Sequence, residues 1–288
     1  MNKYKIFFII LLSIFSFYYT NQVINIIRNS DPIMKDIKKN SAKFSKKALD
    51  ASIEGNYIIP GVNGIKVDNN KSYSKMKNYG KYNENLLVFK EEEPVISVDD
   101  VYDKFIVSGN SNKREVSLIF IIRRDDDISS LLNILLQNNV NVTFFMDGLF
   151  IENNQDLVKD LVDNNHEVEI LSYNGNYQRK YFREVINILE ELTNKKANYC
   201  YTEYSNKEVL NLCRNLSLHT IIPSINIKKR PYNTVKEELK NGSIISLLNN
   251  DYIIGELSTT IKYIKQKGYS IVTLEELLNE ESEETTEE

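Results

Sequence analysis

Five charged residues at the end of an apolar run are the side chains of this 288-residue chain best placed to do chemistry. The run is VSLIFII at 116–122, and its valine and isoleucine content predicts a buried strand. It is followed by Arg123, Arg124, Asp125, Asp126 and Asp127. Carboxylates just beyond a parallel strand are typical of α/β active sites, where they move protons or hold a divalent cation.

The aspartates also have a simpler structural explanation. Helix-like sequence begins at Ile128, so Asp127 is placed to cap that helix, and the other charges can solvate the strand end. Without imidazole partners, paired carboxylates would hold Mg²⁺ or Ca²⁺ only loosely, and the chain has just His166 and His219. We therefore predict a structural role for the cluster and keep ligand binding as the alternative.

Strand-like and helix-like segments alternate from residue 116 to 279. The expected strands are VSLIFII, VNVTFFM, HEVEIL, ANYCY, HTIIPSI, SIISLL and YSIVTL. Strands separated by helices of ten to fifteen residues indicate an α/β fold with a parallel sheet and right-handed crossovers. About seven such units predict a closed or nearly closed barrel, with function at the carboxyl ends of its strands.

The amino terminus predicts export. MNKYK precedes the apolar run IFFIILLSIFSFYYT, so residues 1–20 are expected to form a signal anchor or a signal peptide. No small-x-small cleavage site follows, which favours the uncleaved anchor. We expect a single-pass cell-membrane protein with an extracytoplasmic carboxyl-terminal body, or a secreted protein if the segment is cleaved.

A juxtamembrane stalk and loop-rich extension is expected over 21–115. Its lysine-rich first part, up to about residue 50, could lie against anionic lipid or be a solvated spacer. Residues 280–288 contain six glutamates and predict a disordered acidic tail. Apart from that tail, the formal net charge of −4 becomes about +2, so the chain has no nucleic-acid surface by charge.

The number of cysteines excludes further kinds of structure and metal site. Cys200 and Cys213 are the only two cysteines, which excludes a disulfide scaffold and every multi-cysteine zinc motif. They could pair in an extracytoplasmic body, but their spacing leaves this open.

The order of segments over 116–279 resembles the NodB-like polysaccharide deacetylases, which are carbohydrate esterase 4-like proteins. NNVNVTFFMDG is similar to the family's gvkaTFFvxG, and NNHEVEIL is similar to xGHEixnH. KNGSIISLL is similar to kpGsIiLlH, and KGYSIVTLEELL to kGYxfvTlxeLl. The resemblance implies a distorted (β/α) barrel that hydrolyses N-acetyl groups of amino sugars. It also implies a divalent metal, usually zinc, held by one aspartate and two histidines, with a second aspartate as base and a late histidine as acid.

At the positions that match the family's catalytic motifs, this chain has other residue types. The family motif TFDDG aligns with residues 119–123, and HxxxH aligns with LSYNG. RxPYG aligns with residues 201–205, and LLHD aligns with the end of SIISLL. The family positions are occupied by Ile121, Ile122, Leu171, Gly175, Tyr201 and Leu248. His166 matches a non-ligand histidine of the family and His219 opens a strand, so both are expected to be structural. We therefore predict a divergent member with no catalytic residues of the family type, no metal and no cofactor.

Three functions remain to be distinguished. The leading prediction is a pseudoenzyme that binds a cell-envelope glycan or an envelope protein through its former catalytic cleft. The expected lining is Arg123, Asp125, Asp126, Tyr173, Tyr201, Glu203, Tyr204 and Asn249. The first alternative is an active amidohydrolase of amino-sugar glycans, a hydrolase of non-peptide carbon–nitrogen bonds, with a rearranged metal site. The second is a purely structural envelope protein, for which the cleft should be filled.

Overall fold

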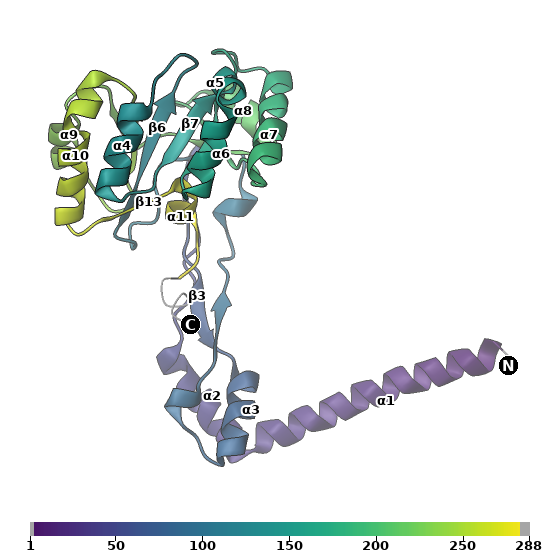
Figure 1. The fold of residues 1–288 in the computed structure, drawn as a ribbon. Helices are drawn as coiled ribbons and strands as arrows, with labels where there is room; N and C mark the ends of the chain where they lie inside the picture. Colours follow the sequence, from purple (N-terminus) through teal and green to yellow (C-terminus); the bar gives the residue numbers. More distant parts are fainter. Residues whose placement is uncertain (1–2, 283–288) are drawn as a thin grey trace. The chain divides into compact units, whose positions relative to one another are not determined.

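The chain forms two compact units within residues 3–282, the part that the computed structural model describes (Figure 1). The smaller unit contains the described residues up to Ala48 together with Asn63–Glu93 and Ser282. The larger unit contains Leu49–Val62 and Pro94–Glu281. Residues 49–62 and 94–115, which we expected in the loop-rich extension, thus belong to the larger unit.

The smaller unit is a helical module with a two-stranded sheet. Its elements are α1 (Lys3–Ser30), α2 (Pro32–Phe44), β3 (Gly64–Val67), α3 (Asn69–Tyr79), the 3-10 turn η1 (Glu84–Leu86) and β4 (Phe89–Glu92). Asp31 caps α2 by accepting a hydrogen bond from the Ile33 amide, and Asp68 caps α3 in the same way. The core side chains of this module are Met34, Ile37, Val67, Tyr73, Met76 and Leu87.

Helix α1 is long and apolar enough to cross a membrane by length and composition. The candidate span is Lys5–Ser30, and its most apolar part has a mean hydropathy of 1.6 and is not buried. Apolar side chains along this helix are exposed. A stretch of about twenty apolar residues is what a bilayer core requires.

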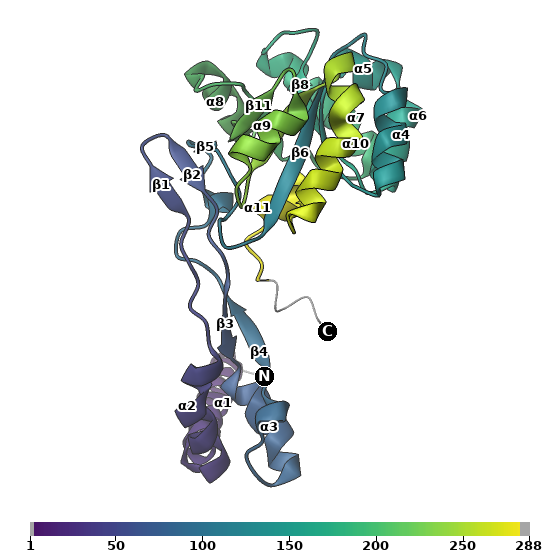
Figure 2. The ribbon, with the colours of Figure 1, turned by 90° about the vertical axis from the view of Figure 1, so that its left-hand side faces the viewer.

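One curled sheet forms the frame of the larger unit. Its strands are β1 (Ser52–Glu54), β2 (Tyr57–Ile59), β5 (Phe105–Ile106), β6 (Glu115–Ile122), β7 (Thr143–Asp147), β8 (Glu167–Ser172), β9 (Tyr199–Tyr201), β10 (His219–Ile221), β11 (Ile225–Ile227), β12 (Ile244–Leu248) and β13 (Ser270–Val272). Their order is β1-β2-β5-β10-β9-β8-β7-β6-β12-β11, with β13 also paired to β6. All pairs are parallel except the antiparallel pair β1–β2, which forms a hairpin (Figure 2).

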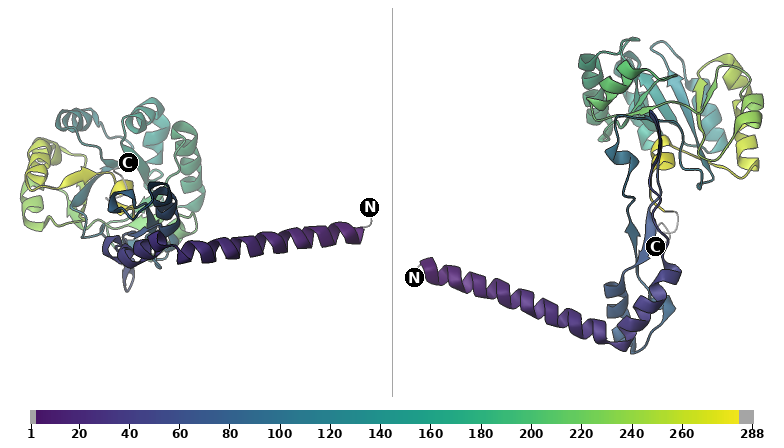
Figure 3. Two further views of the ribbon diagram at one scale, coloured as in Figure 1. Left: turned by 90° about the horizontal axis from the view of Figure 1, so that it is seen from below. Right: turned by 180° about the vertical axis from the view of Figure 1, so that it is seen from behind.

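Helices cover the outside of this sheet. They are α4 (Ser129–Asn138), α5 (Gly148–Asn153), α6 (Gln155–Asp163), α7 (Arg179–Thr193), α8 (Lys207–Arg214), α9 (Pro231–Glu238) and α10 (Asp251–Gln266). The short helix α11 (Leu274–Leu278) and the 3-10 turn η2 (Val98–Asp100) pack instead against the inner face of the sheet. Seen along the strands, most of the outer helices form an arc around the curled sheet (Figure 3). This arrangement is the expected one for parallel strands joined by helical crossovers.

The sheet is an open half-barrel, which corrects our expectation of a closed or nearly closed barrel. The last strand, β13, pairs with Glu115–Ser117 at the amino end of β6. Strand β12 pairs with Ser117–Ile121 of β6, and because Ser117 is a partner of both strands, β12 and β13 lie on opposite edges of β6. Because β13 is used there, it does not continue the sheet from β11 toward β1.

The two faces of β6 pack against different cores. Leu118, Phe120 and Ile122 belong to the large cluster under the helices. Ile119 and Ile121 point to the other face and pack in the cluster enclosed by the curled sheet and α11. The alternation follows from the two-residue period of a strand. A side chain at the end of β6 therefore faces the interior only at odd-numbered positions.

Two glutamates of β8 close the amino end of the interior. The Glu167 carboxylate accepts hydrogen bonds from the Thr143 hydroxyl and from the Leu274 and Glu275 amides. The Glu169 carboxylate accepts from the Asn198 and Tyr199 amides. Burial raises the pKa of Glu167 to about 7, and burial together with the charge of Glu167 raises the pKa of Glu169.

The two histidines have structural surroundings. His166 accepts a hydrogen bond from the Val142 amide, and burial lowers its pKa. His219 is buried and stacked on Tyr102, with 4.2 Å between ring centroids. Burial lowers the pKa of His219 to about 4, so its imidazole is neutral at pH 7.

Candidate functional site

A cavity of about 640 Å³ opens at the carboxyl ends of β6, β7, β8 and β9. This is the end of the sheet where α/β folds place their ligands. The residues that line it are Ile121, Arg123, Arg124, Asp125, Asp126, Asp147, Leu171, Ser172, Asn174, Gly175, Tyr177, Tyr201, Thr202, Glu203, Tyr204, Asn206 and Val209. The cleft is therefore concave and mixed in polarity, and it is not filled by side chains.

Most of the residues that we predicted for the cleft lie in this lining, but two do not. Tyr173 packs on Tyr181 of α7, with ring centroids 5.0 Å apart, and its hydroxyl donates to Glu152. The Asn249 amide donates to the Asp127 carbonyl at 2.9 Å and ties the loop after β12 to the loop after β6. Both side chains are used in holding loops together, so they are removed from the predicted lining.

Of the positions that match the family's catalytic groups, some also line the cavity and others do not. Ile121, Leu171, Gly175 and Tyr201 line the cavity. Ile122 is fully buried under the helices because it occupies the other face of β6. Leu248 packs at the edge of the interior cluster.

These residues do not fit the metal that the fold family uses. Zinc requires imidazole, thiolate or carboxylate ligands, whereas Ile122, Leu171 and Gly175 offer no donor atom in their side chains. The Tyr201 hydroxyl lies 3.1 Å from the Ser246 hydroxyl, deep in the cleft. Within residues 3–282, no three His, Cys, Asp or Glu side chains are grouped so that they could hold a metal ion.

The carboxylates of the Asp125–Asp127 cluster are bonded within the chain. Asp125 accepts three hydrogen bonds from Arg124, at 2.8–3.1 Å, and this guanidinium lowers the pKa of Asp125. Asp126 accepts from the Arg123 amide at 2.9 Å. Asp127 accepts from the amide and hydroxyl of Ser129, so it tethers a helix that begins one residue later than we expected.

The Arg123 guanidinium differs from the other charges of the cleft. Glu203 pairs with Lys228 at 3.2 Å, and Arg124 is occupied by Asp125. Arg123 has no hydrogen bond or ion pair from its side chain to any residue that the structure describes. It is exposed and is thus available to an acceptor group on a ligand.

Asp147 organises the cleft, and sequence reasoning missed it. One carboxylate oxygen accepts from the Leu149 and Asn174 amides, at 3.1 and 3.0 Å. The other oxygen accepts from the Ser172 hydroxyl at 2.6 Å and the Gly175 amide at 3.2 Å. The available signal was an aspartate between the strand TFFM and a helix, which is a cap position.

Two tyrosines stand on different loops of the rim. Tyr177 follows β8 and is 45% exposed, and Tyr204 follows β9 and is 68% exposed. Tyr204 was expected in the lining from the sequence, whereas Tyr177 was not. Burial and the nearby Glu203 raise the pKa of Tyr177, so its phenol is neutral at pH 7. Amide side chains lie beside them, on Asn174 and Asn206.

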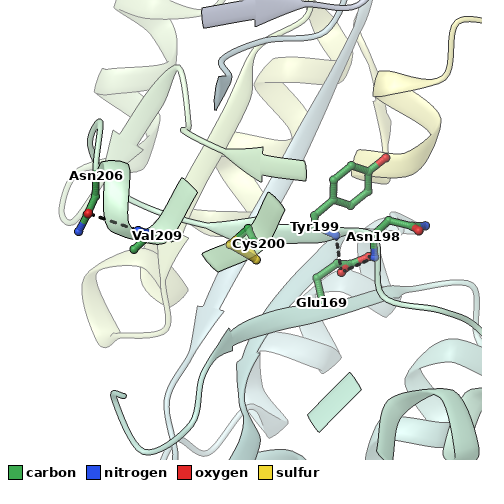
Figure 4. The surroundings of a disulfide bond; sticks show 7 residues. Glu169, Asn198, Tyr199, Cys200, Asn206 and Val209 are labelled. Carbon is green, nitrogen blue, oxygen red and sulfur yellow. Dashed lines mark hydrogen bonds between the residues drawn. A yellow bond between two sulfur atoms is a disulfide. The ribbon is translucent and has the colours of Figure 1, made fainter. Parts of the chain in front are cut away.

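A disulfide holds the loop that carries Tyr204. Cys200 of β9 and Cys213 of α8 are bonded and buried, which settles a pairing that the sequence left open (Figure 4). Inside this link, Asn206 caps α8 by accepting from the Glu208 and Val209 amides. On the other side of Cys200, Glu169 fixes the start of β9 (Figure 4). The rim loop is thus anchored at both ends.

Comparison with known proteins agrees with this geometry. The polysaccharide deacetylase family model matches residues 108–215. The structure of wild-type BA3943 from Bacillus anthracis, described as a CE4 family pseudoenzyme, superposes with a TM-score of 0.65 at 25% identity and covers 88% of this chain and 96% of that one. Residues 108–215 of this chain thus form a polysaccharide deacetylase domain of the NodB-like type.

Two further relatives extend the similarity beyond the deacetylase domain. A BA3943 mutant described as a pseudoenzyme with restored enzymatic activity superposes with a TM-score of 0.66 at 25% identity, covering 87% of this chain and 99% of that one. YlxY of Bacillus subtilis (strain 168) is 26% identical over 276 residues, which cover 89% of this chain and 86% of YlxY. The polysaccharide deacetylase family thus includes a pseudoenzyme that is similar to this chain over most of its length.

Proposed function

We propose that this chain is a membrane-anchored, exported polysaccharide deacetylase-like protein that binds a cell-envelope glycan in its cleft without hydrolysing it. One observation carries the proposal. The cavity at the catalytic end of the sheet is open, yet the family positions that line it are Ile121, Leu171, Gly175 and Tyr201. The cleft has kept the room for a ligand while the groups for metal-assisted hydrolysis are replaced.

The chemistry of the rim favours a sugar. Exposed phenol rings such as Tyr177 and Tyr204 can stack on the apolar face of a pyranose. Asn174 and Asn206 can bond hydroxyl groups, and the free Arg123 guanidinium can donate to a carbonyl, carboxylate or phosphate oxygen. An envelope protein remains the second possible ligand of the same cleft.

The alternatives from the sequence have less support. A rearranged metal site would be built from carboxylates such as Asp125, Asp126 and Glu203. Asp125 and Glu203 are paired with Arg124 and Lys228, and Asp126 accepts a hydrogen bond from the Arg123 amide. A purely structural role was expected to show a filled cleft, whereas the cavity is open. The pseudoenzyme described for BA3943 supports the same choice by analogy.

Export is proposed on two features. Helix α1 has the length and composition of a membrane span and leaves its apolar side chains exposed. The Cys200–Cys213 disulfide belongs to oxidising compartments, because cytosolic thiols are kept reduced.

Calorimetric titration with a soluble N-acetylglucosamine oligomer tests the proposal. We expect Tyr204→Ala to weaken binding by about tenfold, because an aromatic stacking contact contributes about 1–1.5 kcal/mol. Tyr252→Ala is the matched control, since Tyr252 is similarly exposed, at 62%, but does not line the cavity. Glycan binding that both variants retain equally, or no binding by the parent chain to this oligomer or to peptidoglycan fragments, would contradict the proposal.

A further inference from the structure

Helix α2 carries four exposed lysines on one side. They are Lys35, Lys38, Lys39 and Lys43. Successive residues of an α-helix are about 100° apart, so these side chains share one face, with Asp36 at its edge. The opposite face holds Met34 and Ile37, which pack in the core of the smaller unit. We call these four residues the lysine face.

The lysine face is not neutralised within the part of the chain that the structure describes. None of its ammonium groups has an ion pair there, and the hydrogen bond from Lys38 goes to the neutral amide oxygen of Asn29. Lys35 and Lys39, and again Lys39 and Lys43, are four positions apart, where like charges repel across a helix turn. Like charges that break this local rule with no counter-charge among residues 3–282 indicate an anionic partner outside that part of the chain.

The position of α2 directly after the apolar helix α1 indicates which anionic partner could reach the lysine face. Only Asp31 separates α2 from the apolar helix α1. The joint is fixed, because the Arg28 guanidinium donates to Asn70 at 2.9 Å and the Asp31 carboxylate accepts from the Tyr73 hydroxyl at 2.8 Å. If α1 spans the bilayer, as proposed above, α2 begins at the level of the lipid headgroups.

We infer that the lysine face of α2 binds the phosphate groups of anionic phospholipids, which holds the smaller unit against the membrane surface. This inference rests on the proposed anchoring by α1. Each basic residue near an anionic leaflet strengthens such a contact by about fivefold. The contact is electrostatic, so it must weaken when salt screens the charges.

A fluorescent probe at residue 42 in the full chain would test this contact. Ala42 is exposed and lies among the four lysines, and both native cysteines are in the disulfide, so Ala42→Cys offers a single labelling site. The labelled chain is placed in nanodiscs of phosphatidylcholine, with or without phosphatidylglycerol, that contain a lipid with a quenching headgroup. We expect at least about threefold stronger quenching in the anionic discs. That difference should disappear in 1 M salt, where the screening length is about 3 Å.

Charge variants distinguish an effect of the lysine face on quenching from an effect of the net charge of the chain. The triple variant Lys35→Gln, Lys39→Gln, Lys43→Gln should quench in anionic discs only as it does in neutral ones. The control removes the same charge from the larger unit by replacing the exposed residues Lys159, Lys207 and Lys236 with glutamine, and it should behave as the parent chain does.

The possible failures can be told apart. A chain that does not co-elute with the discs overturns the anchoring and the lipid contact together. A chain that co-elutes but is quenched equally in both discs overturns the lipid contact alone. A probe response to inorganic polyphosphate in neutral discs as large as the lipid response would assign the lysine face to a soluble anionic polymer and overturn the lipid contact.

Discussion

Asp147→Ala is expected to lower the free energy of unfolding by about 3 kcal/mol, because donors to a buried carboxylate lose their acceptor. The Asp147 side chain is 3% exposed and accepts four hydrogen bonds. Three of these donors belong to the segment 172–175, so the substitution should also release this part of the cleft rim. Urea denaturation measures the first effect, and amide hydrogen exchange at 173–176 measures the second.

Asp125→Ala is the matched control for this prediction. Asp125 is also a carboxylate of the cleft, but its side chain is 78% exposed and its partner is the exposed Arg124. We expect its loss to change the free energy of unfolding by no more than about 0.5 kcal/mol. Equal stability of the two variants, or unchanged exchange at 173–176, would contradict the role assigned to Asp147.

Removing the disulfide by Cys200→Ala with Cys213→Ala is expected to cost about 3 kcal/mol of stability, from the loss of a closed loop of this length. It should also weaken glycan binding, because the loop that carries Tyr204 lies inside the link. Urea titration of the double variant beside the parent chain measures the first effect, and calorimetric titration measures the second.

The state of the cysteines in the parent chain provides the control. Both sulfur atoms are buried, so thiol reagents should find no free thiol even after denaturation without reductant. Two titratable thiols in the parent chain, or a double variant as stable as the parent, would contradict the account of the rim loop.

Much of the larger unit could be predicted from the sequence because its pattern is local. The run at 116–122 alternates between two cores, as its period requires, and the helices follow the strands in the expected order. The segment similarities to the polysaccharide deacetylase family also placed the cleft at the correct end of the sheet. Arg123, Asp125 and Glu203 were therefore expected in the lining before the structure showed them there.

The remaining features depend on contacts between distant parts of the chain. Asp147 receives three of its four hydrogen bonds from residues 25–28 positions further on, so its local sequence indicates only the helix cap and not its role in the cleft. Strand β5 pairs with β10, more than a hundred residues away, and this pairing draws part of the expected extension into the sheet. The diversion of β13 to β6, which leaves the barrel open, is likewise a choice between two distant edges that no local pattern reveals.

We propose above all that the cleft binds a glycan but has no metal-dependent hydrolase chemistry. The most direct test is the metal content of the chain from Asp31 onward after equilibration with zinc and desalting, followed by an assay of acetate release from an N-acetylated glycan. We predict no retained zinc and no acetate release above buffer, because Ile122, Leu171 and Gly175 offer no ligand in their side chains. One zinc per chain with acetate release abolished by a chelator would contradict this account.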